Sequence, residues 1–446
     1  MRTLLSLAVL TAAITAPAAA QIPIDYYRLP NGLRVVLSED HSAPTVVVGV
    51  YYDIGFRIEP KDRTGFAHLF EHMMFQGSKN LGKNEFIQLI ESNGGVLNGS
   101  TRFDFTNYFE VVPSNALETV LWAEADRMKG LDITQANLAN QQGVVKNEVR
   151  VNVLNQPYGG FPWIDMPMAA NTNWYNAHNF YGELEHLDAA TLQDVQTFFR
   201  QYYAPNNAVL VVTGDFEPAR TKQWVEKYFG VIPRVEPAAK PDISEPRQTE
   251  QREKTRHDPK ANRPALALGW HAPKQMTPEY FAMGLIDQIL VQGRDSRLYQ
   301  RLVQEKALTA GIGGSMNGLG NMFNIKGPTL YTINLIHDND KPAEAIIAEI
   351  DAEITRMQNE KVTQAEIDRA LTKFRSSFYS TLEGLYGFGR ADLLASFALF
   401  YDDPQWINRV EAEFRKVTPE LIQQVAREYL RTTNRTIVKV TNKPVS

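Results

Sequence analysis

The chain is organised around the stretch Gly65-Phe66-Ala67-His68-Leu69-Phe70-Glu71-His72-Met73-Met74-Phe75. Its apolar residues recur at helical spacing, and Gly77 is placed to end a helix. On such a helix His68 and His72 lie four residues apart on one face, where two imidazoles can bind one Zn²⁺. Glu71 lies beside them and is a candidate base for a water molecule activated by the metal. The stretch therefore predicts a catalytic zinc helix.

The same motif also has a simpler interpretation. The chain contains eight histidines in 446 residues, but a short pattern of three fixed residues arises by chance in some chains of this size. Two core histidines with satisfied hydrogen bonds would explain His68 and His72 without any metal. Features elsewhere in the chain have to decide between the two interpretations.

The order His-x-x-Glu-His is the inverse of the more familiar His-Glu-x-x-His zinc motif. The stretch resembles the pitrilysin/insulinase family of zinc metallopeptidases, which includes the mitochondrial processing peptidase and bacterial two-subunit proteases. The resemblance implies a third ligand on a later helix, and Glu148 stands at the corresponding distance. One Zn²⁺ per chain would then be held by His68, His72 and Glu148, with the fourth position left for water. Many relatives carry a supporting glutamate two turns before this ligand; here Gln141 occupies that position and brings no charge.

Residues 1–20 have the composition of a secretory signal peptide. Arg2 precedes an apolar run from Leu4 to Ala13, and Ala18-Ala19-Ala20 precedes an expected cleavage site before Gln21. An uncleaved anchor is the alternative, but a transmembrane helix needs about 20 apolar residues and this run is shorter. No later stretch is long and apolar enough to span a membrane. We expect a bacterial periplasmic or secreted protein.

The overall composition is that of a globular protein, with 43% hydrophobic and 22% charged residues and a formal net charge of −5. This balance does not favour binding to nucleic acid or to anionic membranes. The absence of cysteine excludes disulfides, thiolate metal ligands and a cysteine nucleophile. The length is sufficient for two or more domains with substantial cores.

Local patterns predict the elements near the motif. A hairpin is expected over residues 27–37, a buried strand over 45–52, helices over 84–93, 117–129 and from 134 onward, and two strands within 96–109. The connection from 155 to 186 is rich in Pro, Gly, Asn and aromatic residues and is expected to be long and partly irregular, near the active face. His178 and His186 in this connection are possible additional ligands, although loop histidines are more often exposed to solvent.

The two strands within residues 96–109 resemble the family segment whose edge strand pairs with the backbone of the substrate. An edge strand can bind an extended peptide by β-augmentation with little demand on side-chain identity. The resemblance therefore implies that Asn98, Gly99 and Ser100 contact the substrate. An ordinary hairpin of the sheet is the alternative.

The C-terminal half of the chain repeats the N-terminal half. Residues 191–202 are echoed by 418–429, and Asn207 by Asn434, at a constant offset of 227 residues. We predict an α+β fold of two homologous domains, each a mostly antiparallel sheet packed with helices. The expected boundaries are a signal peptide at 1–20, a zinc-binding domain at 21–233, a linker at 234–262 and a second domain at 263–446. In the second copy Gly284, Asp287 and Gln288 stand where His68, Glu71 and His72 stand in the first, so this copy is not expected to bind zinc.

The resemblance further implies that the chain is one half of a clamshell that closes around a chamber. In the family, the second half-molecule contributes an Arg and a Tyr, seven residues apart, which bind the substrate carbonyl. The matching positions here are Val303 and Ala310, and neither side chain can donate a hydrogen bond. We expect a heterodimer in which a homologous partner without the zinc motif supplies the Arg and the Tyr. A misalignment is the alternative, because Arg297 and Arg301 lie nearby.

Together, these features predict a zinc-dependent endopeptidase subunit that hydrolyses peptides or small unfolded polypeptides. Zinc on His68, His72 and Glu148 would activate water, and Glu71 would accept its proton. The alternative function is a non-catalytic structural or peptide-binding subunit of the same family.

Overall fold

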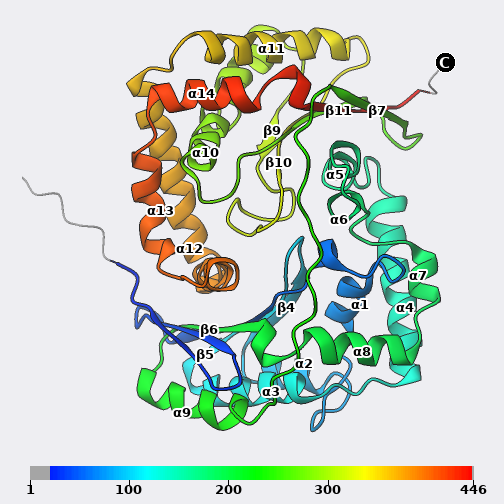
Figure 1. Cartoon of the computed structure of the whole chain (residues 1–446), viewed down its shortest axis with the longest axis vertical. Coiled ribbons are helices and arrows are strands. Elements are labelled where there is room, and N and C mark those ends of the chain that lie inside the picture. The colour runs from blue at the N-terminus through cyan, green and yellow to red at the C-terminus, as the bar shows by residue number, and fades with distance from the viewer. Residues whose placement is uncertain (1–20, 444–446) are drawn as a thin grey trace, which may run out of the picture.

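The computed structural model describes residues 21–443, which form two β-sheets covered by helices (Figure 1). The predicted signal peptide at 1–20 lies outside the described residues. The strands are β1 Asp25–Arg28, β2 Arg34–Glu39, β3 Thr45–Tyr52, β4 Val96–Thr101, β5 Thr106–Pro113, β6 Ala208–Gly214, β7 Arg252–His257, β8 Ala265–His271, β9 Gly313–Ser315, β10 Leu330–Ile336 and β11 Arg435–Thr441. The helices are α1 Phe66–Met73, α2 Glu85–Ser92, α3 Leu117–Lys129, α4 Gln135–Val149, α5 Asp165–Ala170, α6 Trp174–Ala177, α7 Leu184–Asp188, α8 Leu192–Tyr202, α9 Pro218–Phe229, α10 Pro278–Leu290, α11 Ala343–Asn359, α12 Gln364–Tyr401, α13 Trp406–Arg415 and α14 Pro419–Tyr429. The chain also forms two π-helical segments, Arg150–Leu154 directly after α4 and Tyr299–Glu305 between α10 and β9.

The first sheet has six strands in the order β1-β2-β6-β3-β5-β4. All neighbouring pairs are antiparallel except β2 and β6, which are parallel. The predicted hairpin is confirmed: β1 and β2 pair across Asn31-Gly32, and Gly32 has φ +92°, a conformation that glycine adopts readily. The prediction of a buried strand at 45–52 is confirmed by β3, which occupies the middle of the sheet.

The second sheet reproduces the first without an equivalent of β1. Its order is β7-β11-β8-β10-β9, with β7 and β11 parallel and the other pairs antiparallel. Asn207 donates to the carbonyl of Tyr202 at 2.9 Å, and Asn434 donates to the carbonyl of Tyr429 at 2.7 Å. The echo of 227 residues in the sequence therefore corresponds to the same turn between helix and strand in both halves.

Strand register extends this equivalence across both sheets. In the first sheet, one row of register partners across β6, β3, β5 and β4 consists of Leu210, Val50, Tyr108 and Gly99. In the second sheet, the row across β11, β8, β10 and β9 consists of Ile437, Leu268, Ile333 and Gly314. Because residues 210 and 437 differ by the repeat offset, Gly99 of β4 and Gly314 of β9 are structural equivalents. The predicted α+β fold of two related, mostly antiparallel halves is confirmed.

One helix from each half packs against the sheet of the other half. The C-terminal part of α12 contacts β2, β3 and β6 of the first sheet, whereas α5 contacts β7, β8 and β11 of the second. Figure 1 shows this exchange, since α5 lies beside β11 although it is close to α4 in sequence. Both faces of the first sheet are consequently buried: Val35 and Leu37 face α1 and α3, and Val36 joins the core of the second half.

The segment from 231 to 251 crosses between the two halves without regular structure. The side chain of Asn173 donates to the carbonyls of Asp242 and Ser244, at 2.9 and 3.0 Å, and holds this segment against the first half. The chain then forms β7, which pairs with β11. Part of the segment predicted as a linker thus supplies an edge strand to the second sheet.

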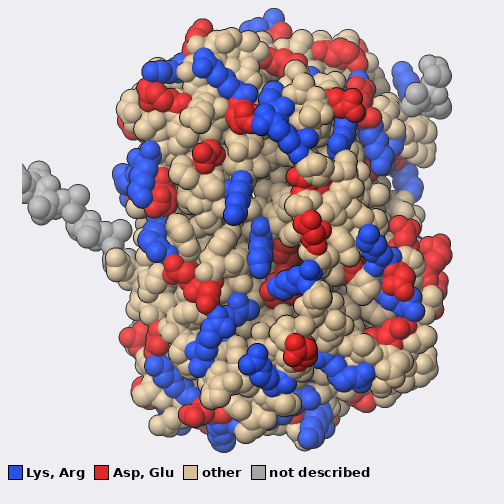
Figure 2. Space-filling model, viewed as in Figure 1, with Lys and Arg blue, Asp and Glu red and all other residues tan. Residues whose placement is uncertain are grey.

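The surface carries both signs of charge. Figure 2 shows Lys and Arg interspersed with Asp and Glu over the face seen in Figure 1, in line with the small net charge. Across residues 21–443, none of the helices combines the length and apolar character needed to cross a bilayer.

Candidate metal centre

Helix α1 brings the motif into the core of the first half. It follows β3 after a loop, and its N-cap is Gly65, whose φ of +84° favours glycine. Phe66, Leu69, Phe70 and Met73 are buried under the first sheet. His68 is also buried, at 4% exposure, whereas His72, with 21% of its side chain exposed, lies closer to solvent. Because the apolar residues of α1 face the sheet, both imidazoles lie on the side of the helix that faces α4.

Helix α4 brings Glu148 to the two histidines. The side chain of Thr134 caps α4 by accepting the N–H of Asn137 at 3.1 Å, and α4 packs against α1. Near the end of α4, Glu148 Oε1 lies 3.6 Å from His68 Nε2, and Oε2 lies 3.2 Å from His72 Nε2. Among the described residues, these three side chains form a group whose ligand atoms all lie within 4.8 Å of one another.

These three side chains form a group that could hold a metal ion. Zinc bonds of about 2.1 Å in a tetrahedron separate ligand atoms by about 3.4 Å, and each histidine has one oxygen of Glu148 at a similar distance, Oε1 for His68 and Oε2 for His72. The donor set of two imidazoles and one carboxylate matches that of catalytic zinc sites, in which a fourth position stays open. Glu148 has 30% of its side chain exposed, so the group is accessible from outside the core.

Two of the three side chains are held in the protonation states that metal binding requires. Burial lowers the pKa of His68 to about 4, so this imidazole is neutral near pH 7. A hydrogen bond with His72 lowers the pKa of Glu148, with smaller contributions from the charge of His68 and from Asn152. A neutral imidazole and an ionised carboxylate can both bind a cation without first releasing a proton.

Glu71 is fixed by the edge strand β4. Thr101 Oγ1 donates to Glu71 Oε2 at 2.7 Å, which leaves Oε1 to accept a proton. A Cβ atom placed on Gly99 would lie 3.2 Å from Glu71 Cγ, so β4 passes directly over this carboxylate. Burial raises the pKa of Glu71, while Thr101 and His72 oppose the rise. A carboxyl with a raised pKa is better matched to general-base work near neutral pH.

The predicted substrate strand lies beside this carboxylate. β4 is the last strand of the first sheet, and within the described residues no strand pairs with its outer edge. Asn98 is exposed, and Gly99 and Ser100 are half-buried. Ser100 Oγ donates to Asn107 of the neighbouring strand. The backbone of β4 is therefore available along an edge that runs next to Glu71.

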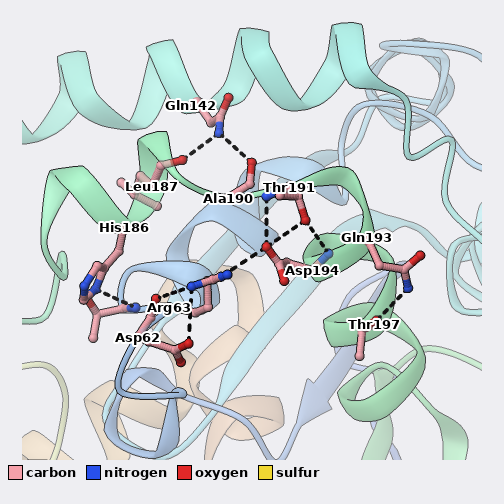
Figure 3. Close-up of polar contacts among 11 residues, drawn as sticks. Asp62, Arg63, Gln142, His186, Leu187, Ala190, Thr191, Gln193, Asp194 and Thr197 are labelled. Atoms are coloured by element: carbon pink, nitrogen blue, oxygen red, sulfur yellow. Dashed lines mark hydrogen bonds and ion pairs between the residues drawn. The ribbon is translucent and has the colours of Figure 1, made fainter.

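Figure 3 shows how the segment from α7 to the first turn of α8 connects α4 with the loop that precedes α1. Gln142 of α4 donates to the carbonyls of Leu187 and Ala190, at 2.6 and 3.3 Å. Arg63, in the loop before α1, donates to Asp194 at 3.1 Å, and Asp194 caps α8 together with Thr191. The segment thus contacts both the helix that carries Glu148 and the approach to the helix that carries the histidines.

The remaining candidates from the sequence do not join the group. His186 Nδ1 lies 2.8 Å from Thr64 Oγ1, and His178 Nε2 lies 2.8 Å from the carbonyl oxygen of Phe56. The expectation that loop histidines are exposed is wrong for His178, whose side chain is 6% exposed because it stacks on Trp174. Gln141 is buried and donates to Asn140 at 2.8 Å.

The second half has neither histidine nor glutamate at the three positions equivalent to His68, His72 and Glu148. Gly284 and Gln288 of α10 replace the two histidines, and counting from the capping residues Thr134 and Thr363 places Ser377 of α12 where Glu148 stands. These positions line a cavity of about 200 Å³ together with Asp287, the counterpart of Glu71. That this half does not bind the same metal stays a prediction, which rests on these residue types.

Sequence reasoning missed Thr101. A threonine in a strand is usually explained by β-propensity. Strand alternation could have indicated its position, because Thr101 lies two residues from Gly99 and therefore on the same face of the strand. Only the packing of α1 against β4 shows that this face meets Glu71.

The two-sheet fold, with its possible His-His-Glu metal group, is a zinc protease-like fold. Residues 34–158 match the family model described as "Insulinase (Peptidase family M16)", and residues 189–374 match "Peptidase M16 inactive domain". The chain belongs to the M16 (insulinase/pitrilysin) peptidase family. The second model begins just before α8 and extends into α12, so it includes most of the half that lacks the histidines.

Individual relatives agree with this assignment. The chain is 27% identical to "Zinc protease PqqE" of Helicobacter pylori over 419 residues, 92% of this chain and 91% of the relative. The crystal structure of a protease from Helicobacter pylori superposes with a TM-score of 0.86 at 27% identity, covering 95% of this chain and all of that one. The periplasmic protease PqqL from Escherichia coli gives a TM-score of 0.76 at 17% identity, and the match covers 95% of this chain but 48% of PqqL. The chain therefore has the fold of about half of PqqL.

Proposed function

We propose that this chain is the metal-bearing subunit of a zinc-dependent endopeptidase. The observation that carries the proposal is the convergence of His68, His72 and Glu148 within 4.8 Å, with the carboxylate of Glu71 beside them under an open strand edge. Relatives named as zinc proteases support the same chemistry.

In this proposal the protein's own groups divide the work of hydrolysis. His68, His72 and Glu148 would hold zinc, which when bound supplies Lewis acidity towards a carbonyl oxygen and a water molecule. The edge of β4 binds the peptide backbone as an added strand and aligns the scissile bond with Glu71. Glu71 Oε1 accepts a proton from the attacking water and delivers it to the nitrogen of the leaving amine. Thr101 keeps Oε2 engaged and so holds the carboxylate in one orientation.

The proposed active form is a heterodimer with a homologous subunit. Val303 and Ala310 offer no hydrogen bond to a developing oxyanion, and loss of one such donor lowers the rate by about 10²–10³. The nearby arginines are engaged elsewhere, because Arg297 pairs with Glu366 at 2.8 Å and Arg301 pairs with Glu349 at 2.6 Å. The correspondence of this chain to about half of PqqL supports a second half-molecule as the source of the donors.

The proposed location is the periplasm or the exterior of a bacterial cell. The argument rests on the signal-like sequence of residues 1–20. A relative of similar fold, PqqL, is described as periplasmic.

The test compares the purified chain alone with the chain mixed with the product of a neighbouring homologous gene. Zinc content and cleavage of an unstructured fluorogenic peptide are measured with and without a chelator. We expect zinc in both samples and chelator-sensitive cleavage only in the mixture. Intact peptide in a zinc-loaded mixture would instead favour a peptide-binding subunit without turnover.

A further inference from the structure

A buried glutamate caps the helix that carries the two histidines. Glu59 lies in the loop between β3 and α1 and has no exposed surface. Its Oε2 accepts the N–H of Gly65 at 2.9 Å, and its Oε1 accepts the N–H of Ala67 at 2.5 Å. Gly65 is the N-cap of α1, and Ala67 lies in its first turn and immediately precedes His68.

Helix α1 needs such a partner from outside. The first N–H groups of any helix have no acceptor within the helix, and side chains at the N-cap usually supply one. The N-cap of α1 is Gly65, which has no side chain. Because α1 spans only eight residues, it also gains little stability from its own length. Glu59 takes the place of the missing cap.

The ring of His68 lacks the usual means of orientation. A metal-binding histidine normally donates its second ring nitrogen to a carboxylate or a carbonyl, which fixes the ring. His68 Nδ1 is buried, and among the described residues it has no hydrogen-bond partner. The ring instead packs against Phe180 and Tyr181, at centroid distances of 5.8 and 5.2 Å. Its position therefore depends on the backbone of α1, which Glu59 holds one residue away.

The loop that carries Glu59 is itself anchored to the second half of the molecule. Arg57 is buried and donates to Asp104 at 2.7 Å and to the carbonyl of Pro328 at 3.1 Å. Asp104 also accepts the N–H groups of Lys326 and Gly327, at 2.8 and 3.1 Å. Contacts between the two halves therefore hold the loop in place, and Glu59 on this loop bonds to the start of α1.

We propose that Glu59 is a positioning residue for the metal centre, which sets metal affinity by holding the first turn of α1 and, through it, His68. This inference rests on the proposed zinc site. It predicts that the two hydrogen bonds to α1 matter for affinity beyond any general effect on stability.

The decisive variant is Glu59→Gln, which preserves shape but replaces one acceptor oxygen with an NH₂ group that would face an amide N–H. Glu110→Gln is the matched control, because Glu110 is equally buried in the same half and pairs with Arg127 instead of α1. Zinc dissociation constants are measured by competition with a chelating dye, and the absorption bands of the cobalt-loaded protein report ligand geometry. We expect zinc to bind about 10–100-fold more weakly in Glu59→Gln, with altered cobalt bands, and wild-type values in the control.

An unchanged dissociation constant and unchanged cobalt bands in Glu59→Gln overturn the inference, as does an equal loss in Glu110→Gln. If Glu59→Gln does not fold, Glu59→Asp decides, since its shorter side chain cannot reach both donors: weakened binding supports the inference and wild-type binding refutes it. Failure of the wild-type chain to bind zinc would refute the proposed function itself, which is a separate outcome.

Discussion

The metal centre in the first half and its counterpart in the second half occupy the same place in the same fold. Gly99 and Gly314 share a register position, and each lies against an acidic side chain, Glu71 in one half and Asp287 in the other. What differs is the set of residues that could bind a metal. A shared scaffold therefore does not imply shared chemistry, which resides in a few side chains placed upon it.

The second half has an acidic residue, Asp287, at the position of Glu71, and Asp287 is buried more deeply than Glu71. Burial raises the pKa of Asp287 to about 7. Met316 stands two residues beyond Gly314, in the place of Thr101, so the second strand offers no hydroxyl there. In the first half, Glu71 therefore has a hydrogen-bonding partner and lies beside the possible metal ligands. In the second half, Asp287 lines a cavity without such ligands.

The largest difference between the halves should come from their acidic residues. Glu71→Gln is expected to lower peptide cleavage by about 10²–10⁴, because a general base contributes about that much, and to retain zinc. Asp287→Asn is expected to leave cleavage within about twofold, since Asp287 lies outside the metal group. Steady-state rates on a fluorogenic peptide and zinc content test both. A zinc-loaded Glu71→Gln variant with full activity would remove Glu71 as the base.

Metal binding provides the second contrast. His68→Ala is expected to lose stoichiometric zinc, because two remaining ligands hold zinc poorly. Gln288→Ala, at the position equivalent to His72, is expected to keep one zinc per chain. Metal analysis after dialysis against a weak chelator measures both. Full occupancy in His68→Ala would show that His68 is not a ligand.

Two buried groups, His68 in the first half and Asp287 in the second, should contribute to stability with opposite dependence on pH. In the metal-free protein, the lowered pKa of His68 contributes stability above pH 6.5, which is lost as the pH falls towards 4, by about 3 kcal/mol in all. The raised pKa of Asp287 contributes stability below about pH 4, which is lost as the pH rises through 7, by up to about 4 kcal/mol. Asp287→Asn cannot ionise and should therefore unfold at higher denaturant concentration than wild type at pH 8, but not at pH 4. Equal shifts at both pH values would contradict this assignment.

The smallest effect should come from the hydroxyl that the second half lacks. Thr101→Val removes the hydrogen bond to Glu71 and is expected to lower kcat about tenfold, in keeping with a bond to a charged group, with KM and zinc content unchanged. Thr101→Ser should restore most of the rate, and Ser100→Ala serves as the control on the same strand. A Thr101→Val variant that changes KM alone would indicate a role in peptide binding instead.

Local sequence patterns predicted most elements of the fold. The Asn31-Gly32 turn, the run of β-branched residues at 45–52 and the periodic helix at 117–129 all form where they were expected. Such elements follow from propensities and periodicities that act over a few residues. The motif and the family resemblance also nominated Glu148, and the structure brings it to the two histidines.

Contacts between distant segments could not be predicted in this way. Nothing local distinguishes α5 or the end of α12 as helices that cover the sheet of the other half. Glu59 lies among charged residues in a loop and resembles a solvated side chain, yet it is fully buried. His178 was expected to be exposed for a similar reason. Burial depends on what packs against a residue from elsewhere in the chain, and that information is not contained in its neighbours.

The sequence by itself determined the repeat, the residue types available for chemistry and the half in which they occur. Residue identity fixes which side chains can bind a metal or accept a proton, and an offset of 227 residues is readable without coordinates. Only the tertiary structure decided which carboxylate meets which helix: Glu148 with His68 and His72, Thr101 with Glu71, and Glu59 with the first turn of α1. The physical reason is that a hydrogen bond or a shared metal requires atoms within about 3 Å, and separation along the chain does not set that distance.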